Sequence, residues 1–361
     1  MHTRSIPDAS SPATPVAPTP IDVTGPPTGV LALPGQHPLQ LVMDEQFVYW
    51  VGLPDERFLY RASLQPTVQP TEIEVVAESR YPKGVLLQLP LTRSREWVLF
   101  SDSASPAISS EWTIRRLNLV TGEESTLVES TGEQLLYGFA LNDQHAAWSI
   151  LDHNSNRTCQ DEAVLRLMNL TTGQQTELDR ACFQTEHSWN ILAFSGDTLI
   201  ANLLDNSVGD APWGRVARFD LAGGQPLAYT IISDQAGEGQ TNFRPQAVGD
   251  WVTWSRGEEG FGEPALLNLR TTETATLPIA ASTAPCQYLQ VTQRWITGYD
   301  CMNPERLLLY DPAQRQVVRL QTNADLSGAV VASTGNAVAV ARAVEPDTAK
   351  PDSVIEWYEV K

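Results

Sequence analysis

The chain has 361 residues, of which 42% are hydrophobic and ten are Trp, and its formal net charge is −19 at pH 7. An acidic surface repels phosphate backbones and no Lys or Arg cluster offsets it, so nucleic acid is excluded as an expected partner. Apolar runs such as Ala337–Ala341 are far shorter than the roughly 18 residues of a transmembrane helix, so the composition indicates a folded, soluble protein without a transmembrane segment.

Residues 1–27 are rich in Pro, Ser and Thr and show no apolar periodicity, which predicts a disordered tail. The tail is not preceded by the apolar core of a signal peptide. A tail of this kind is nevertheless typical of the segment between a lost membrane or lipid anchor and an exported domain. We therefore expect an extracytoplasmic protein, periplasmic, cell-surface or secreted, whose signal or anchor is absent from this sequence.

One unit recurs from residue 28 to residue 361, with a mean separation of about 48 residues, between the WD40 and kelch periods. Its second strand is rich in Trp and β-branched residues, and the seven copies begin at Phe47, Trp97, Ala146, Thr198, Trp251, Arg294 and Ala337. Its third strand ends in Leu in most copies, and these begin at Leu59, Ile114, Leu165, Val216, Leu266, Leu307 and Ile355. The pattern predicts an all-β fold, a seven-bladed β-propeller of four-stranded blades spanning 28–361.

A tight turn follows the third strand, because Thr121-Gly122 and Thr172-Gly173 place glycine where a hairpin needs a positive φ. The fifth copy has Thr272-Glu273 at this point, and we expect a different turn type there.

The seventh copy reaches Lys361 directly after its third strand, so its fourth strand must come from elsewhere. The segment Thr28–Pro34 repeats the Thr-Gly turn and the apolar strand of the other copies. We therefore predict that an N-terminal strand completes the last blade and closes the ring, which removes an open sheet edge.

The repeats resemble those of the TolB-like and WD40-like propeller families, through the Trp-bearing strand, the polar loop and the hairpin pattern seen in Ile114–Gly122. The first copy, Tyr49–Gly52 followed by Leu59–Leu64, is also similar to a YWTD-type repeat, although it lacks the Thr-Asp half of that motif. The Gly-His and Trp-Asp signatures of WD40 repeats are missing as well. The resemblance covers roughly residues 28–361 and implies a propeller.

The four cysteines allow three complete pairings. Cys159 falls between the second and third strands of blade three, Cys182 falls at the passage into blade four, and Cys286 and Cys301 hold comparable positions around blade six. Loops of these two types share one face of a propeller, which favours the disulfides Cys159–Cys182 and Cys286–Cys301 and an oxidising compartment. Four buried free thiols are an alternative, and a metal site is another, although no Cys-x-x-Cys spacing occurs.

No nucleophile elbow, zinc-binding helix or phosphate-binding loop occurs, so no catalytic residue, metal or cofactor is expected. Several polar residues follow the second strand of their blades and should gather on one face as a recognition rim, namely Asp102, Asp152, Asp205, Arg256 and Asp300. Trp213, at the end of a long loop, either adds an exposed aromatic contact to this face or packs against its own blade.

The leading hypothesis is a non-enzymatic exported propeller that binds a protein, peptide or glycan through its loop-bearing face. One alternative is an enzyme, a lyase or glycan hydrolase, whose central pocket lacks a local motif. Another is a structural module of a cell-envelope complex, which would carry a large apolar patch.

Overall fold

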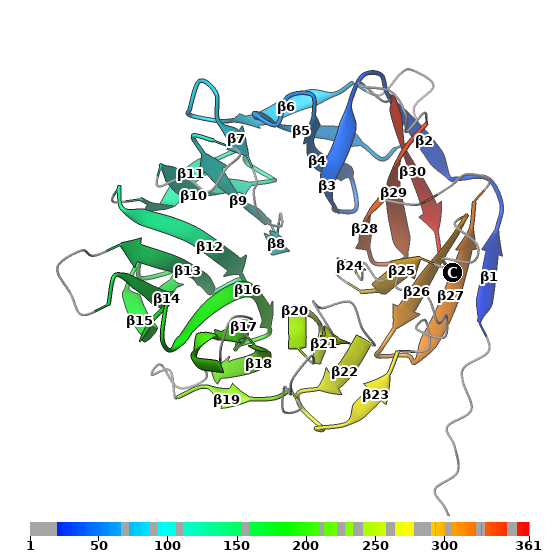
Figure 1. The fold of residues 1–361 in the computed structure, drawn as a ribbon. Helices are drawn as coiled ribbons and strands as arrows, with labels where there is room; N and C mark the ends of the chain where they lie inside the picture. The colour runs from blue at the N-terminus through cyan, green and yellow to red at the C-terminus, as the bar shows by residue number, and fades with distance from the viewer. Residues whose placement is uncertain are drawn as a thin grey trace, which may run out of the picture.

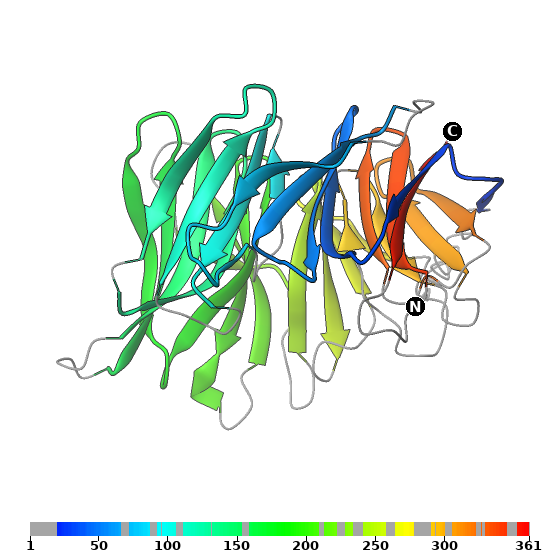
Figure 2. The same cartoon turned by 90° about the horizontal axis from the view of Figure 1, so that it is seen from above.

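Seven β-sheets form a ring around a central axis (Figure 1), and a view turned by 90° shows the blades standing side by side (Figure 2). The computed structural model describes residues 20–65, 72–86, 92–94, 96–105, 111–130, 132–153, 159–208, 213–221, 228–233, 241–257, 264–277, 290–292, 294–299, 305–322, 326, 329–344 and 352–360. The predicted all-β seven-bladed propeller is confirmed.

The first four blades contain their strands in chain order from the axis outward (Figure 1). Blade one consists of β3 (His37–Met43), β4 (Phe47–Leu53), β5 (Phe58–Ser63) and β6 (Glu74–Glu78). Blade two consists of β7 (Val85–Leu86) and β8 (Thr92–Ser94), then β9 (Trp97–Ser103), β10 (Trp112–Asn118) and β11 (Glu124–Glu129). Blade three consists of β12 (Gln134–Leu141), β13 (His145–His153), β14 (Asp161–Asn169) and β15 (Gln175–Cys182). Blade four consists of β16 (His187–Ser195), β17 (Thr198–Asp205), β18 (Trp213–Asp220) and β19 (Thr230–Ile231), with a 3₁₀ turn at Asn206–Val208.

The last three blades complete the ring. Blade five consists of β20 (Thr241–Val248), β21 (Trp251–Gly257), β22 (Pro264–Asn268) and β23 (Thr274–Thr276). Blade six consists of β24 (Gln290–Val291), β25 (Ile296–Tyr299), β26 (Arg306–Asp311), β27 (Gln316–Gln321) and an added strand β1 (Ile21–Thr24). Blade seven consists of β28 (Val330–Thr334), β29 (Ala337–Ala343), β30 (Ser353–Glu359) and β2 (Gly29–Leu33). Every second and third strand predicted from the repeats lies in that place of its blade.

The core is divided into layers between neighbouring blades, because alternate side chains of a strand point to opposite faces of its sheet. Trp50 on β4 packs with Ala339 and Ile355 of blade seven. Its neighbour Tyr49 packs instead with Leu86 and Val98 of blade two. On the second strand of a blade, the side chains that lie on the same face of the sheet as Trp50 therefore point toward the preceding blade.

Ring closure follows the prediction. Strand β2 pairs antiparallel with β30, joining Gly29 to Trp357 and Leu33 to Ser353. Leu31 and Leu33 are buried in the layer between blades seven and one, whereas Val30 between them is 53% exposed. Closure therefore comes from apolar burial as well as from the hydrogen bonds of the sheet.

The N-terminal tail differs in part from the prediction of disorder over 1–27. Residues 1–19 lie outside the described residues, but Ile21–Thr24 forms β1, which pairs in parallel with β27 of blade six. Val23 packs against the core of blades six and seven. This contact and the open edge of β27 explain the strand in a segment too polar and short to form one alone.

In blades two, three, five and six the turn after the third strand is built around an Asn or Asp side chain, which is Asp311 in blade six. In blades two, three and five the side-chain oxygen accepts from the backbone N–H groups two and three residues later, and this residue is Asn118, Asn169 and Asn268 respectively. Thr272 in blade five has a φ of 58° and takes the place of Gly122, whose φ is 71°. The expected change of turn type is therefore wrong, because the cap is kept and Thr272 adopts the left-handed conformation.

Candidate functional site

Asp102, one of the predicted rim residues, is buried inside the protein. Its Oδ2 accepts from Nη1 of Arg115 on β10 at 2.7 Å and from the backbone N–H of Arg80 at 2.8 Å, and its Oδ1 accepts from the hydroxyl of Ser79 at 2.6 Å. The side chains of Asp102 and Arg115 are 0% and 4% exposed. This carboxylate therefore ties blade two to blade one and is not presented at the surface.

Asp152 and Asp205 lie at the ends of β13 and β17, on the face that carries the loops between second and third strands. Both are partly exposed. The Asp205 carboxylate accepts from the backbone N–H and hydroxyl of Ser207 and lies 3.6 Å from Nη2 of Arg215. Blades three and four thus bring two of the predicted residues to the same face.

The disulfide predicted between Cys159 and Cys182 is present on this face, with 5.6 Å between the two Cα atoms. It fixes the segment before β14 to the end of β15, where Glu162 and Cys182 are paired. The chain then turns into blade four, and the Glu186 carboxylate accepts from the Cys182 backbone N–H at 2.7 Å. The second predicted pair, Cys286 with Cys301, lies outside the described residues.

Acidic groups surround this disulfide. Asp161 pairs with the exposed ring of His153 at 2.7 Å, and the hydrogen bond that this carboxylate accepts from the ring raises the pKa of His153. Glu186 is exposed beside the turn, and its backbone C=O accepts from the N–H of Asn206 in blade four at 2.8 Å. We name Asp152, Asp161, Glu186 and Asp205 the acidic platform, since all four lie where blades three and four meet the loop-bearing face.

Of the other predicted rim residues, Trp213 adjoins this platform through its backbone, and Arg256 lies on another blade. Arg256, at the end of β21, is exposed on blade five. The backbone of Trp213 begins β18 and pairs with Asp205, while its side chain lies outside the described residues. Asp300 also lies outside them. In the described part of the chain, no group of three His, Cys, Asp or Glu side chains has a geometry that could hold a metal ion.

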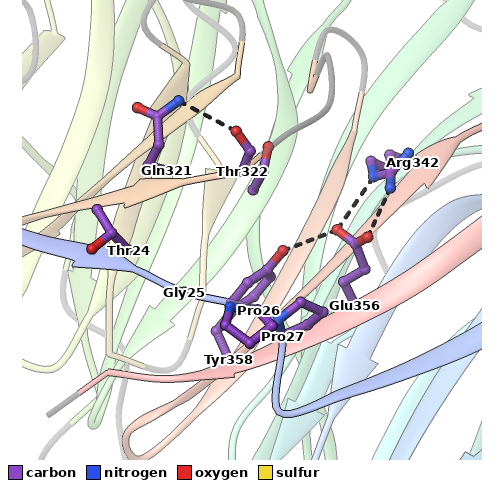
Figure 3. Close-up of a pocket in the computed structure, with 9 residues that line it drawn as sticks. All are labelled: Thr24, Gly25, Pro26, Pro27, Gln321, Thr322, Arg342, Glu356 and Tyr358. Atoms are coloured by element: carbon purple, nitrogen blue, oxygen red, sulfur yellow. Dashed lines mark hydrogen bonds and ion pairs between the residues drawn. The ribbon is translucent and has the colours of Figure 1, made fainter.

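A second polar site, missed by the sequence reasoning, lies between blades six and seven. Arg342 stands five residues into β29, as Asp102 does in β9 and Arg256 in β21, so the same repeat position could have singled it out. Its Nη2 donates to Oε1 of Glu356 on β30 at 2.7 Å, and the hydroxyl of Tyr358 donates to Oε2 at 2.9 Å (Figure 3). Burial and then the Glu356 carboxylate raise the pKa of Tyr358.

These side chains border a cavity of about 470 Å³, which we name the interblade cleft; its other lining residues are Thr24, Gly25, Pro26, Pro27, Gln321 and Thr322 (Figure 3). Gly25–Pro27 connects β1 on blade six to β2 on blade seven and so crosses the cleft. The volume lies in the range of roughly 300–1,000 Å³ that small-ligand pockets occupy.

A search of protein-family models and a search of curated proteins found no match to this chain. Solved structures do match in fold. A prolyl endopeptidase structure is 11% identical with a TM-score of 0.58, over 87% of this chain and 45% of that one, so this chain spans less than half of its length. An oligogalacturonate lyase from Vibrio parahaemolyticus is 13% identical with a TM-score of 0.55, over 91% of each chain.

TolB from Acinetobacter baumannii also aligns, at 13% identity over 83% of this chain and 65% of that one, but its TM-score of 0.46 is too low to support an argument. The resemblance of the repeats to those of TolB-like and WD40-like propellers is confirmed as a likeness of fold, because the chain itself forms a ring of seven blades. No helix in the described part of the chain is long and apolar enough to cross a bilayer.

Proposed function

We propose that this protein is a non-enzymatic binding propeller, which holds a positively charged protein or peptide on the loop-bearing face of blades three and four. The observation that carries the proposal is the acidic platform around the Cys159–Cys182 disulfide. Loops held by a rigid scaffold are where binding residues concentrate in folded proteins.

The charge of the platform supports a basic partner. Among the described residues, two of its four carboxylates are paired with a basic side chain, since Asp205 lies 3.6 Å from Arg215 and Asp161 lies 2.7 Å from the ring of His153. The whole chain carries a formal charge of −19, so the field around it also attracts cations. Complementary charge speeds encounter and selects the partner, and it acts at the rim of an interface more than at its centre.

Rigidity supports the same role. The segment between blades three and four is held by the disulfide, by the Glu186 carboxylate on the Cys182 N–H, and by a hydrogen bond from Asn206 Nδ2 to the Phe183 carbonyl at 2.6 Å. A surface ordered before binding loses little conformational entropy on binding. We further propose an extracytoplasmic location, since a disulfide persists in oxidising compartments.

The test measures binding of a lysine-rich twelve-residue peptide and of its glutamate-rich counterpart by biolayer interferometry at two salt concentrations. One variant neutralises the platform with Asp152→Asn, Asp161→Asn, Glu186→Gln and Asp205→Asn. A matched control also removes four charges, with Glu45→Gln, Glu96→Gln, Glu123→Gln and Asp197→Asn, which are exposed in turns of the opposite face.

We expect binding of the basic peptide alone, weaker at high salt, and a loss of about tenfold or more in the platform variant but not in the control. Equal affinity of the two variants for the basic peptide would refute the acidic platform as its binding site. Turnover of an oligosaccharide, or binding of neutral glycans without binding of basic peptides, would refute the function and favour the enzymatic or glycan-binding alternatives.

A further inference from the structure

Two aromatic rings lie beside the acidic platform. Tyr137 is on β12 of blade three, and Phe183 is in the segment that joins blade three to blade four. Their ring centroids are 6.3 Å apart and the interplanar angle is 62°, so the edge of one ring meets the face of the other. Both side chains are partly exposed, which leaves aromatic surface available to a partner. Aromatic residues are enriched at the centre of protein interfaces, where charged residues are depleted.

A β-bulge determines where Tyr137 lies. The register between β12 and β13 shifts between Leu136 and Gly138, which makes Tyr137 the extra residue of its strand. A bulge bends the strand and re-aims a side chain, and bulges are frequent beside active sites. Blade four lies close at this point, because a Cβ added to Gly138 would be 3.0 Å from the backbone nitrogen of Ile191. The bulge therefore places Tyr137 at the boundary between the two blades of the platform.

Asp161, a member of the acidic platform, lies beside both rings. The Phe183 backbone N–H donates to the Asp161 carbonyl at 2.9 Å, so the two residues are neighbours where β14 begins and β15 ends. Asp161 also acts on Tyr137, since burial and then the charge of Asp161 raise the pKa of the Tyr137 hydroxyl. Glu186 is exposed three residues after Phe183. A cation seated on the rings would therefore meet a carboxylate as well.

Elsewhere in this chain, arginine side chains are held by a ring and a carboxylate together. Cζ of Arg61 lies 4.7 Å from the centroid of the Phe47 ring, and Nε of Arg61 donates to Glu74 at 2.8 Å. Arg294 likewise lies over an aromatic ring and donates to a carboxylate. A planar guanidinium can stack on a ring while the N–H groups at its edge bind a carboxylate, whereas the compact ammonium of lysine is a point charge.

We propose that the acidic platform recognises an arginine side chain of the partner, whose guanidinium stacks on the Tyr137–Phe183 pair and hydrogen-bonds to the Asp161 carboxylate. This inference rests on the proposed function and deepens it, because it names the group of the basic partner that is bound. The carboxylates of the platform attract the partner, and the aromatic pair distinguishes arginine from lysine.

The probes are two twelve-residue peptides of equal charge and otherwise identical sequence, with arginine at every basic position of one and lysine at those positions of the other. Biolayer interferometry measures the affinity of the full chain for both peptides. Tyr137→Leu/Phe183→Leu keeps apolar bulk and removes the rings. The matched control is Phe58→Leu/Tyr60→Leu, which removes a partly exposed ring pair with centroids 6.0 Å apart on β5 of blade one.

We expect wild type and the control to bind the arginine peptide at least about five times as tightly as the lysine peptide, and Tyr137→Leu/Phe183→Leu to bind the two equally. Equal affinity of wild type for the two peptides, or an arginine preference that survives loss of both rings, would overturn the inference and leave the acidic platform standing. If wild type binds neither peptide, the proposed function fails and the inference with it. Should the double variant melt early, Phe183→Leu alone decides, since Phe183 lies outside the strands.

Discussion

Arg115 donates to Asp102 across 2.7 Å in an ion pair that is almost fully withdrawn from water. Removing the Asp102 carboxylate leaves Arg115 paired with Glu124, whose Oε2 lies 2.6 Å from Nη2, but leaves the Ser79 hydroxyl and the Arg80 N–H without their acceptor. For Asp102→Ala we therefore expect a loss of about 1–3 kcal/mol for each buried donor left unpaired, measured by urea denaturation as the free energy of unfolding. Asp22→Ala, which removes the exposed contact with Arg319 at 3.6 Å, should cost at most about 1 kcal/mol. Similar losses in the two variants would show that burial of the first pair is not decisive.

Closure of the ring can be tested within one strand. Leu31 on β2 is 5% exposed, whereas its neighbour Val30 is 53% exposed. Leu31→Ala should lower the free energy of unfolding by about 2–5 kcal/mol because it opens a cavity between blades seven and one. Val30→Ala should change it by less than about 0.5 kcal/mol. Thermal unfolding of both variants measures the two losses. A large effect of Val30→Ala would contradict the conclusion that burial of Leu31 stabilises the closure.

The disulfide closes a loop with a sequence separation of 23 residues. By loop entropy alone its removal should cost about 3 kcal/mol. Cys159→Ser/Cys182→Ser should therefore melt at a lower temperature than wild type. Reduction of the Cys159–Cys182 bond should lower the melting temperature of wild type, and this variant has no such bond to lose. A melting temperature unchanged by the double substitution would mean that the loops are held by their hydrogen bonds.

Asp179 links stability to pH. Burial alone would raise the pKa of its carboxyl, but hydrogen bonds from His187 at 2.7 Å and Trp189 at 2.6 Å outweigh burial and hold the pKa below its usual value of 3.8. Because the folded-state pKa is depressed, the stabilisation is complete above the unfolded pKa and is lost as the pH falls through the folded one. Asp179→Asn should thus be less stable than wild type at pH 7, and the difference should shrink below about pH 4. A stability difference that grows as the pH falls would mean that folding does not lower the pKa of Asp179.

Thr272 and Gly122 hold the same left-handed turn position, with φ values of 58° and 71°. A side chain in this conformation costs roughly 1–2 kcal/mol, which glycine avoids. Thr272→Gly should therefore raise the melting temperature, and Gly122→Thr should lower it, although no atom lies within 4 Å of a Cβ at Gly122. Opposite shifts in differential scanning calorimetry are expected; a loss of stability in Thr272→Gly would indicate that the hydrogen bond from the Thr272 hydroxyl to the Thr271 carbonyl at 2.6 Å outweighs the strain.

Much of the fold follows from local patterns in the sequence. The alternation of apolar residues, the Trp-bearing strands and the Asn-Leu-x-Thr-Gly hairpins determine strand order within a blade, because register and turn geometry are short-range properties. The repeat count then determines the ring, and the unmatched strand at Gly29–Leu33 determines its closure. The Cys159–Cys182 pair follows for the same reason, since repeat position alone assigns both residues to one face.

The tertiary structure decided which polar side chains reach the surface. Asp102, Arg256 and Arg342 share one repeat position, yet the first is sealed by Ser79 and Arg80, the second is exposed, and the third borders a cavity. Their exposure depends on what the preceding blade places against them, and that contact joins residues distant in sequence. Strand β1 could not be predicted from the sequence either. The strand that orders Ile21–Thr24 is β27, which lies nearly three hundred residues later in the chain.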